Sequence, residues 1–211
     1  MINFIKGCKI PNSDKLCEEY SFQEGNMILA NVNAEKILNI IYNFIDMQDD
    51  NSKLFLFLEV PSDLKDETVI KEATDTEVGI LENSHKDVYY MDYIPKKVIK
   101  DVIEPVKDIL INDGFTCFGI GNLDTSDEIG KYKYNTVMLH YAEDIKDYEK
   151  IFIDNQISKN QNMIMPEDLI NKDNPGECEI YTGKDGRNIY DVVEAFKDTF
   201  EEFYKAETRE E

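Results

Sequence analysis

The sequence has few of the residues on which many catalytic and metal sites depend. It contains two histidines, His85 and His140, and two arginines, Arg187 and Arg209. So few histidines offer little to a histidine-based triad or to a His-rich metal site. So few arginines leave almost no guanidinium for bidentate recognition of phosphate or carboxylate groups.

The cysteines are also sparse and widely separated. The four of them stand at positions 8, 17, 117 and 178, and no C-x-x-C pair occurs. This spacing excludes a zinc knuckle and the dense framework of a small disulfide-stapled protein. We therefore expect reduced thiols that serve mainly as small core residues, and no bound metal.

Long hydrophobic runs are missing as well. The longest, residues 54–58, has five apolar residues, whereas a membrane-spanning helix needs about 20. The first ten residues do not show a basic stretch followed by an apolar one, which is the pattern of a secretion signal. The sequence thus predicts no membrane association and a cytoplasmic location.

Motifs for phosphate binding and for nucleophilic catalysis are absent. Gly119 and Gly121 lie in GIGN, but no third glycine completes G-x-G-x-x-G, and Asp124, Asp127 and Glu128 follow. Acids at this place would repel a phosphate, so we interpret the glycines as backbone features of a strand end. No G-x-S-x-G or H-E-x-x-H pattern occurs, and we expect no cofactor.

Negative charge, in contrast, is abundant. The chain has 211 residues, with 44 Asp and Glu against 23 Lys and Arg, a formal net charge of −21. This excess disfavours direct binding to nucleic acid or to an anionic membrane, because both need basic patches.

The negative charge is concentrated in residues 46–92, where 13 acids face four lysines. Tyrosines adjoin this cluster, and tyrosine readily anchors an otherwise polar interface. The residues that we predict to bind a partner are Asp49, Asp50, Asp63, Asp66, Glu67, Glu72, Asp75, Glu77, Tyr89 and Tyr90. The competing interpretation is that these acids only form solvated loops and helix ends.

Apolar residues at helical spacing predict four helices, at residues 34–47, 95–112, 144–155 and 189–205. Pro105 lies inside the second and predicts a kink or break near Glu104. The last has an apolar stripe and an acidic back, which is typical of a helix packed on a core.

Strands are predicted at residues 28–32, 53–60, 87–93, 115–120, 132–141 and 177–182. Residues 115–141 resemble two strands joined by the long polar turn GNLDTSDEIG. Because strands and helices neither alternate strictly nor segregate, we expect an α+β fold. It would be a mixed, mainly antiparallel sheet with about four helices packed on it. All 211 residues would form one domain, with residues 61–86 as an acidic loop.

Two functions from different classes fit these observations. The first is a non-catalytic protein that docks on a basic protein partner and inhibits it, for example an immunity-type antidote to a cationic nuclease toxin. The second is a carboxylate-centred hydrolase, with or without the assistance of a metal ion, that uses Glu59 or His140. A subunit of a larger cytosolic complex is a further alternative, and the oligomeric state stays open. The shortage of catalytic motifs favours the first.

Overall fold

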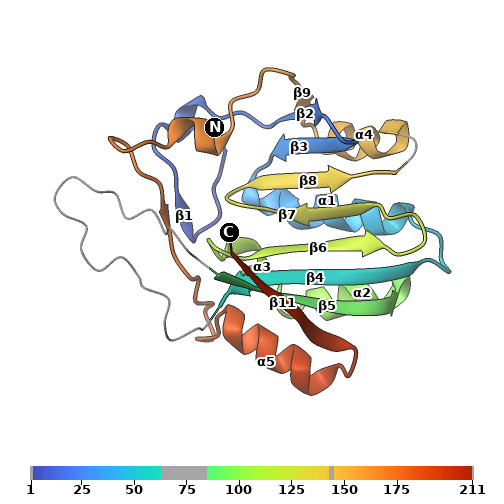
Figure 1. Ribbon diagram of the computed structural model, residues 1–211. Coiled ribbons are helices and arrows are strands. Elements are labelled where there is room, and N and C mark those ends of the chain that lie inside the picture. Colours follow the sequence, from blue (N-terminus) through green and yellow to red (C-terminus); the bar gives the residue numbers. More distant parts are fainter. Residues whose placement is uncertain (1, 63–84, 143–144, 211) are drawn as a thin grey trace.

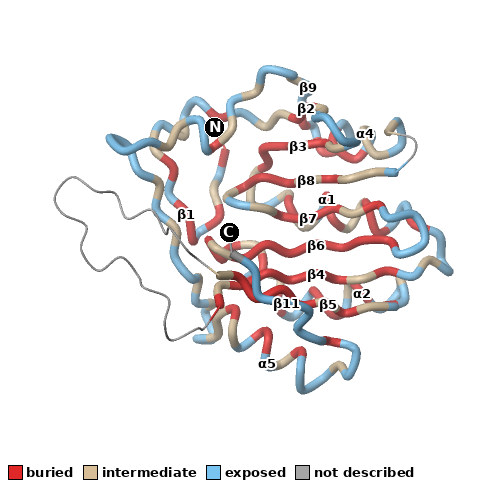
Figure 2. Tube along the Cα trace, in the orientation of Figure 1, coloured by how far each residue is buried: buried red, intermediate tan, exposed pale blue. Residues whose placement is uncertain are grey.

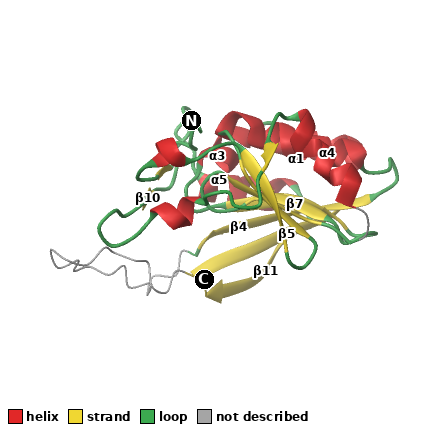
Figure 3. Ribbon diagram, turned by 90° about the horizontal axis from the view of Figure 1, so that it is seen from above, coloured by secondary structure: helices red, strands yellow, loops and turns green. Residues whose placement is uncertain are grey.

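A computed structural model describes residues 2–62, 85–142 and 145–210 of the chain. A nine-stranded sheet forms its centre, and five α-helices gather on one side of the sheet (Figures 1 and 3). A mainly antiparallel sheet with helices on one face is an α+β fold, which confirms the predicted class. In the part of the chain that the structure describes, no helix has the length and apolar character to cross a bilayer.

The strands of the large sheet come from nearly the whole length of the chain. They are β2 (Glu19–Gln23), β3 (Met27–Asn31), β4 (Lys53–Pro61), β5 (His85–Pro95), β6 (Cys117–Asn122), β7 (Glu128–Lys131), β8 (Thr136–His140), β9 (Ser158–Lys159) and β11 (Phe203–Glu210). Their order is β11-β5-β4-β6-β7-β8-β3-β2-β9, and every pair is antiparallel except β2 with β9. A separate two-stranded sheet pairs β1 (Cys8–Lys9) with β10 (Glu177–Cys178).

The helices lie where their apolar stripes predict them. They are α1 (Ala34–Met47), α2 (Lys96–Ile103), α3 (Lys107–Asn112), α4 (Ile145–Asp154) and α5 (Ile189–Thr199), with short 3₁₀ turns η1 (Ser13–Lys15) and η2 (Pro166–Leu169). The predicted break is confirmed, since α2 ends just before Glu104 and α3 begins after Pro105. Proline lacks the N–H that a continuous helix needs at this position.

The prediction of one helix over residues 189–205 is wrong at its C-terminal end. Helix α5 ends at Thr199, and β11 then pairs with the edge of β5. Phe203 from β11 stacks on Tyr89 of β5 with ring centroids 5.2 Å apart. Helical and strand spacing both place Phe203 on the core side, so the apolar stripe could not distinguish the two structures.

Two strand predictions also need correction. The polar segment expected as one long turn contains β7, which begins at Glu128, and residues 132–135 form the next turn before β8. The predicted strand at 177–182 is reduced to the two residues of β10. The acidic loop expected at 61–86 falls mostly outside the described residues; at its ends, Pro61 belongs to β4 and His85 to β5.

The core lies between the sheet and the helix layer. On β4, Leu54, Leu56, Leu58 and Val60 are at most 2% exposed and face the helices, as the period-2 alternation of a strand requires. Buried positions follow the central strands of the sheet, whereas the edge strands β9 and β11 are mostly exposed (Figure 2). The alternate residues of each strand lie on the opposite face.

Candidate interaction surface

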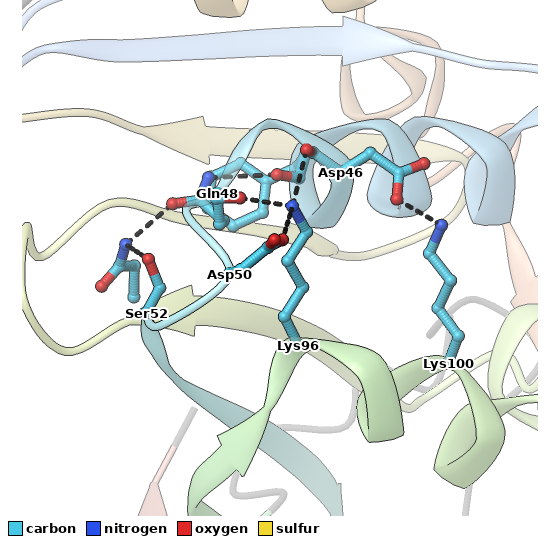
Figure 4. Close-up of polar contacts among 8 residues, drawn as sticks. Asp46, Gln48, Asp50, Ser52, Lys96 and Lys100 are labelled. Carbon is cyan, nitrogen blue, oxygen red and sulfur yellow. Dashed lines mark hydrogen bonds and ion pairs between the residues drawn. The ribbon is translucent and has the colours of Figure 1, made fainter.

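The predicted acids Asp49 and Asp50 lie in the turn between α1 and β4, and Figure 4 shows Asp50 there. Lysines from α2 reach this turn. Lys100 Nζ lies 2.6 Å from Asp46 Oδ1, and Lys96 Nζ lies 3.4 Å from Asp50 Oδ1. These exposed ion pairs offset part of the acidic charge that the sequence places at this turn.

Lys96 also satisfies the end of α1. Its Nζ donates to the main-chain carbonyls of Asp46, at 3.0 Å, and of Gln48. A cation at the C-terminal end of a helix binds the last carbonyls and complements the helix dipole. The contacts at this turn therefore explain its charges as a capped helix end. The role of Asp49 and Asp50 in partner binding stays a prediction.

Six of the predicted partner-binding residues fall outside the described residues. They are Asp63, Asp66, Glu67, Glu72, Asp75 and Glu77. Their role likewise stays a prediction that the structure does not test.

The two predicted tyrosines lie on opposite faces of β5. Tyr89 is only 5% exposed and packs with Phe203 in the core beside α5, where Lys197 Nζ lies 5.4 Å from its ring centroid. Tyr90 faces the side of the sheet away from the helices and is half-buried. The expectation that both rings lie at one surface is thus corrected for Tyr89, because neighbouring strand residues alternate between faces.

Tyr90 belongs to a row of register partners that crosses seven neighbouring strands on the face opposite the helices. From β3 to β11 this row is Leu29, Met138, Gly130, Gly119, Phe57, Tyr90 and Tyr204. Figure 1 views the sheet from this face, with β11 crossing in front. The row joins apolar and aromatic side chains into one band across the sheet.

Glycines allow the aromatic rings to lie against the backbone of this face. A Cβ atom on Gly119 would come within 2.4 Å of Phe57 Cζ, and one on Gly121 within 2.1 Å of Phe55 Cζ. Real Cβ atoms do not approach other atoms so closely, so each ring occupies the space that the glycine leaves free. The two glycines of GIGN therefore leave the space in which these aromatic rings pack against the backbone.

The aromatic band continues to the exposed edge of the sheet. Ring centroids are 5.9 Å apart for Phe55 and Tyr90 and 6.3 Å apart for Tyr90 and Tyr204. Tyr204 is 47% exposed, and its hydroxyl donates to Asp92 Oδ2 at 2.9 Å. Tyr93, beside Tyr204, is 67% exposed and has a φ of 59°. A left-handed backbone is unfavourable for a bulky residue.

Carboxylates surround these tyrosines. Burial raises the pKa of Tyr90, and the charges of Glu128 and Glu59 raise it further. Burial, with the charge of Glu59, also raises the pKa of Tyr132 to about 12. Glu59, only 7% exposed, forms an ion pair with Arg209 of β11.

We name this surface the tyrosine face and define it by Phe55, Tyr90, Asp92, Tyr93, Glu128 and Tyr204. Sequence reasoning missed most of it. Tyr204 was assigned to a helix, and Phe55 and Glu128 lie on strands whose order the sequence does not give. The adjacent β-forming residues Phe203 and Tyr204, followed by Thr208, are the signal that could have indicated β11.

The residues considered for hydrolysis, Glu59 and His140, lie on the same side of the sheet as the tyrosine face. His140 lies opposite Glu128 on the same face, and Glu59 is paired with Arg209. A pocket of about 410 Å³ includes Asp127, whose carboxylate accepts hydrogen bonds from Tyr148 Oη at 2.6 Å, Thr125 Oγ1 at 2.6 Å and Ala142 N at 2.7 Å. These bonds hold the turn before β7 against α4.

Within residues 2–62, 85–142 and 145–210, no group of three His, Cys, Asp or Glu side chains is arranged to hold a metal ion. Comparison with known proteins adds no assignment: no protein-family model matches the chain, and searches of curated proteins and of solved structures found no match.

Proposed function

We propose that this protein is a non-catalytic acidic binding protein that docks on a basic protein partner through the tyrosine face. The observation that carries the proposal is the row of aromatic rings that ends in exposed Tyr204, with exposed Tyr93 nearby and carboxylates along its border. The hydrolase alternative has no comparable observation in its favour and stays a prediction.

The chemistry of this face suits lysine and arginine side chains. Tyrosine rings attract cations over their faces and supply a large contact area at small entropic cost. Carboxylates at the edge of an aromatic patch form ion pairs and accelerate encounter with a positively charged partner. The net charge of −21 extends this attraction over the whole molecule.

The amino-acid composition of the segment between β4 and β5 also supports binding to a basic partner. Residues 63–84 include seven acids and two lysines. Both strands that this segment joins contribute to the tyrosine face. Among partners, we propose a cationic nuclease toxin that the protein inhibits in the cytoplasm by covering an active site that handles anionic nucleic acid.

The first experiment captures partners from a lysate of the source organism on the tagged protein, at about 50 mM and about 500 mM salt. The test variant combines Tyr204→Ala with Glu128→Lys. The matched control combines Tyr42→Ala with Glu35→Lys, which makes the same changes on α1 in the helix layer. A third variant reverses the charges of Asp63, Asp66 and Glu67.

We expect one basic protein to bind the wild type and the helix-layer control, and to be released at high salt. Loss of an aromatic anchor and reversal of a neighbouring charge should weaken its binding at least about 10-fold. The captured protein is then assayed as a nuclease with and without the wild type. Capture that is equal for all variants, or no basic partner at either salt, would refute the proposal. Loss only in the third variant would move the interface to residues 63–67.

A further inference from the structure

Two cysteines from opposite ends of the chain meet in the small two-stranded sheet. Cys8 of β1 lies directly opposite Cys178 of β10, and their Sγ atoms are 3.0 Å apart. Both are free thiols. They are 170 positions apart in sequence, so only the tertiary structure brings them together.

The backbone holds the two residues in a geometry suited to a covalent bond. Glu179 N donates to Gly7 O at 2.9 Å, which makes Cys8 and Cys178 a non-hydrogen-bonded pair of the antiparallel ladder. Side chains approach most closely in such pairs. A disulfide bond has an S–S distance of about 2.05 Å, so closure requires the sulfur atoms to move together by about 1 Å.

The backbone on the Cys8 side is also tightly packed. A Cβ atom on Gly7 would lie 2.5 Å from Gly114 N and 2.8 Å from Glu179 O. The strand that carries Cys8 is therefore held close to its neighbours, and the two thiols stay in register.

The two thiols differ in acidity and in access. Cys8 is 5% exposed, whereas Cys178 is partly exposed. The hydrogen bond from Cys8 lowers the pKa of Cys178, and the charge of Lys131 lowers it further. The same hydrogen bond, together with burial, raises the pKa of Cys8.

Lys131 is a buried lysine whose charge acts on both thiols, although burial lowers its own pKa. Its side chain is fully buried, and Nζ donates to the carbonyls of Asp113 at 2.6 Å, Thr116 at 2.9 Å and Leu110 at 3.3 Å. Three acceptors use the three protons of an ammonium group. A partly exposed thiol near a cation is the environment in which cysteine is reactive.

We propose that Cys8 and Cys178 form a reversible disulfide when the protein meets hydrogen peroxide, with Cys178 as the thiol that reacts first. The Cys178 thiolate attacks one peroxide oxygen and becomes a sulfenic acid, and the other oxygen leaves as water after protonation. Cys8 then attacks the Cys178 sulfur and releases a second water. Two thiols and one hydrogen peroxide thus give one disulfide and two waters. A reducing dithiol reverses the bond by thiol–disulfide exchange.

The test treats the intact wild-type protein with hydrogen peroxide and then alkylates the remaining thiols under denaturing conditions. Digestion and mass spectrometry should find the Cys8 and Cys178 peptides joined, and a loss of about 2 Da for two hydrogens. Treatment with dithiothreitol should restore both thiols. Cys17, which is exposed, serves as the internal control. It should still react with the alkylating reagent and should form no disulfide with another cysteine of the same chain.

Single-cysteine variants test the order of the steps. In Cys8→Ser, a sulfenic acid on Cys178 should persist and react with a dimedone-type probe. In Cys178→Ser, labelling of Cys8 should be several-fold lower. Full alkylation of both cysteines in the oxidised wild type would overturn the proposal, and so would a disulfide that contains Cys17 or Cys117. The alkylation measurement is made on the wild-type protein, so it does not depend on the folding of any variant.

Discussion

Replacing Asn135 by alanine should strongly destabilise the fold, because this buried side chain ties the N-terminal segment to the sheet. Asn135 is 1% exposed. Its Oδ1 accepts from Ile5 N at 2.9 Å, and its Nδ2 donates to Asn3 O at 2.8 Å and Val32 O at 2.7 Å. The sequence gives no sign of this role.

The magnitude follows from which groups lose their partners. Asn3 O keeps a hydrogen bond from Ala34 N at 2.9 Å, so its loss is small. In the variant, Ile5 N and Val32 O would be buried without their hydrogen-bond partner. Each such group lowers the free energy of unfolding by about 1–3 kcal/mol. We therefore expect Asn135→Ala to lower the free energy of unfolding by about 3 kcal/mol.

The assay is urea denaturation followed by circular dichroism. With a slope of about 3 kcal/mol per M for a chain of this size, the midpoint should fall by about 1 M. Asn135→Asp should cost at least as much, because an oxygen would replace the amide that donates to two carbonyls. The control Asn51→Ala, at an exposed position before β4, should change stability by less than about 0.5 kcal/mol. A loss of under about 1 kcal/mol in Asn135→Ala would refute the reasoning.

Two further predictions concern the tyrosine face and acid stability. Gly119→Ala should destabilise the protein by about 1–3 kcal/mol in thermal melts, because the new Cβ would displace the ring of Phe57; an unchanged melting temperature would contradict this packing of the ring against the glycine. The hydrogen bond from Tyr20 lowers the pKa of Glu149 below its ordinary 4.5. Its contribution to stability is therefore present above about pH 4.5 and is lost as the pH falls through the lowered pKa. Glu149→Gln should make stability fall less between pH 5 and pH 3 than in the wild type, and an equal fall would contradict this assignment.

Much of the helix layer could be predicted from the sequence. Helix α1 has the predicted bounds, α4 ends one residue before its predicted end, and Pro105 separates α2 from α3. These features depend on residues close together in the chain. Apolar spacing defines a buried helix face, and a proline removes a local hydrogen bond.

The candidate site could be predicted only in part. Tyr90 was expected at a surface, but its neighbours Phe55, Glu128 and Tyr204 come from three other strands. Which strands adjoin one another depends on long-range pairing, and a single sequence does not state that pairing. The position of Tyr89 could not be predicted for a similar reason. Strand alternation places Tyr89 and Tyr90 on opposite faces, but it does not identify which face the helices cover.

The sequence by itself determined the local and additive properties of this protein. These are its strong net negative charge, its apolar stripes and its lack of metal and nucleophile motifs, since each depends on composition or on neighbouring residues. The tertiary structure alone decided that β11 completes the edge of the sheet, that Phe57 lies over Gly119, and that Cys8 meets Cys178. These contacts join residues far apart in the chain, and they form because the register of antiparallel strands fixes which side chains lie opposite one another.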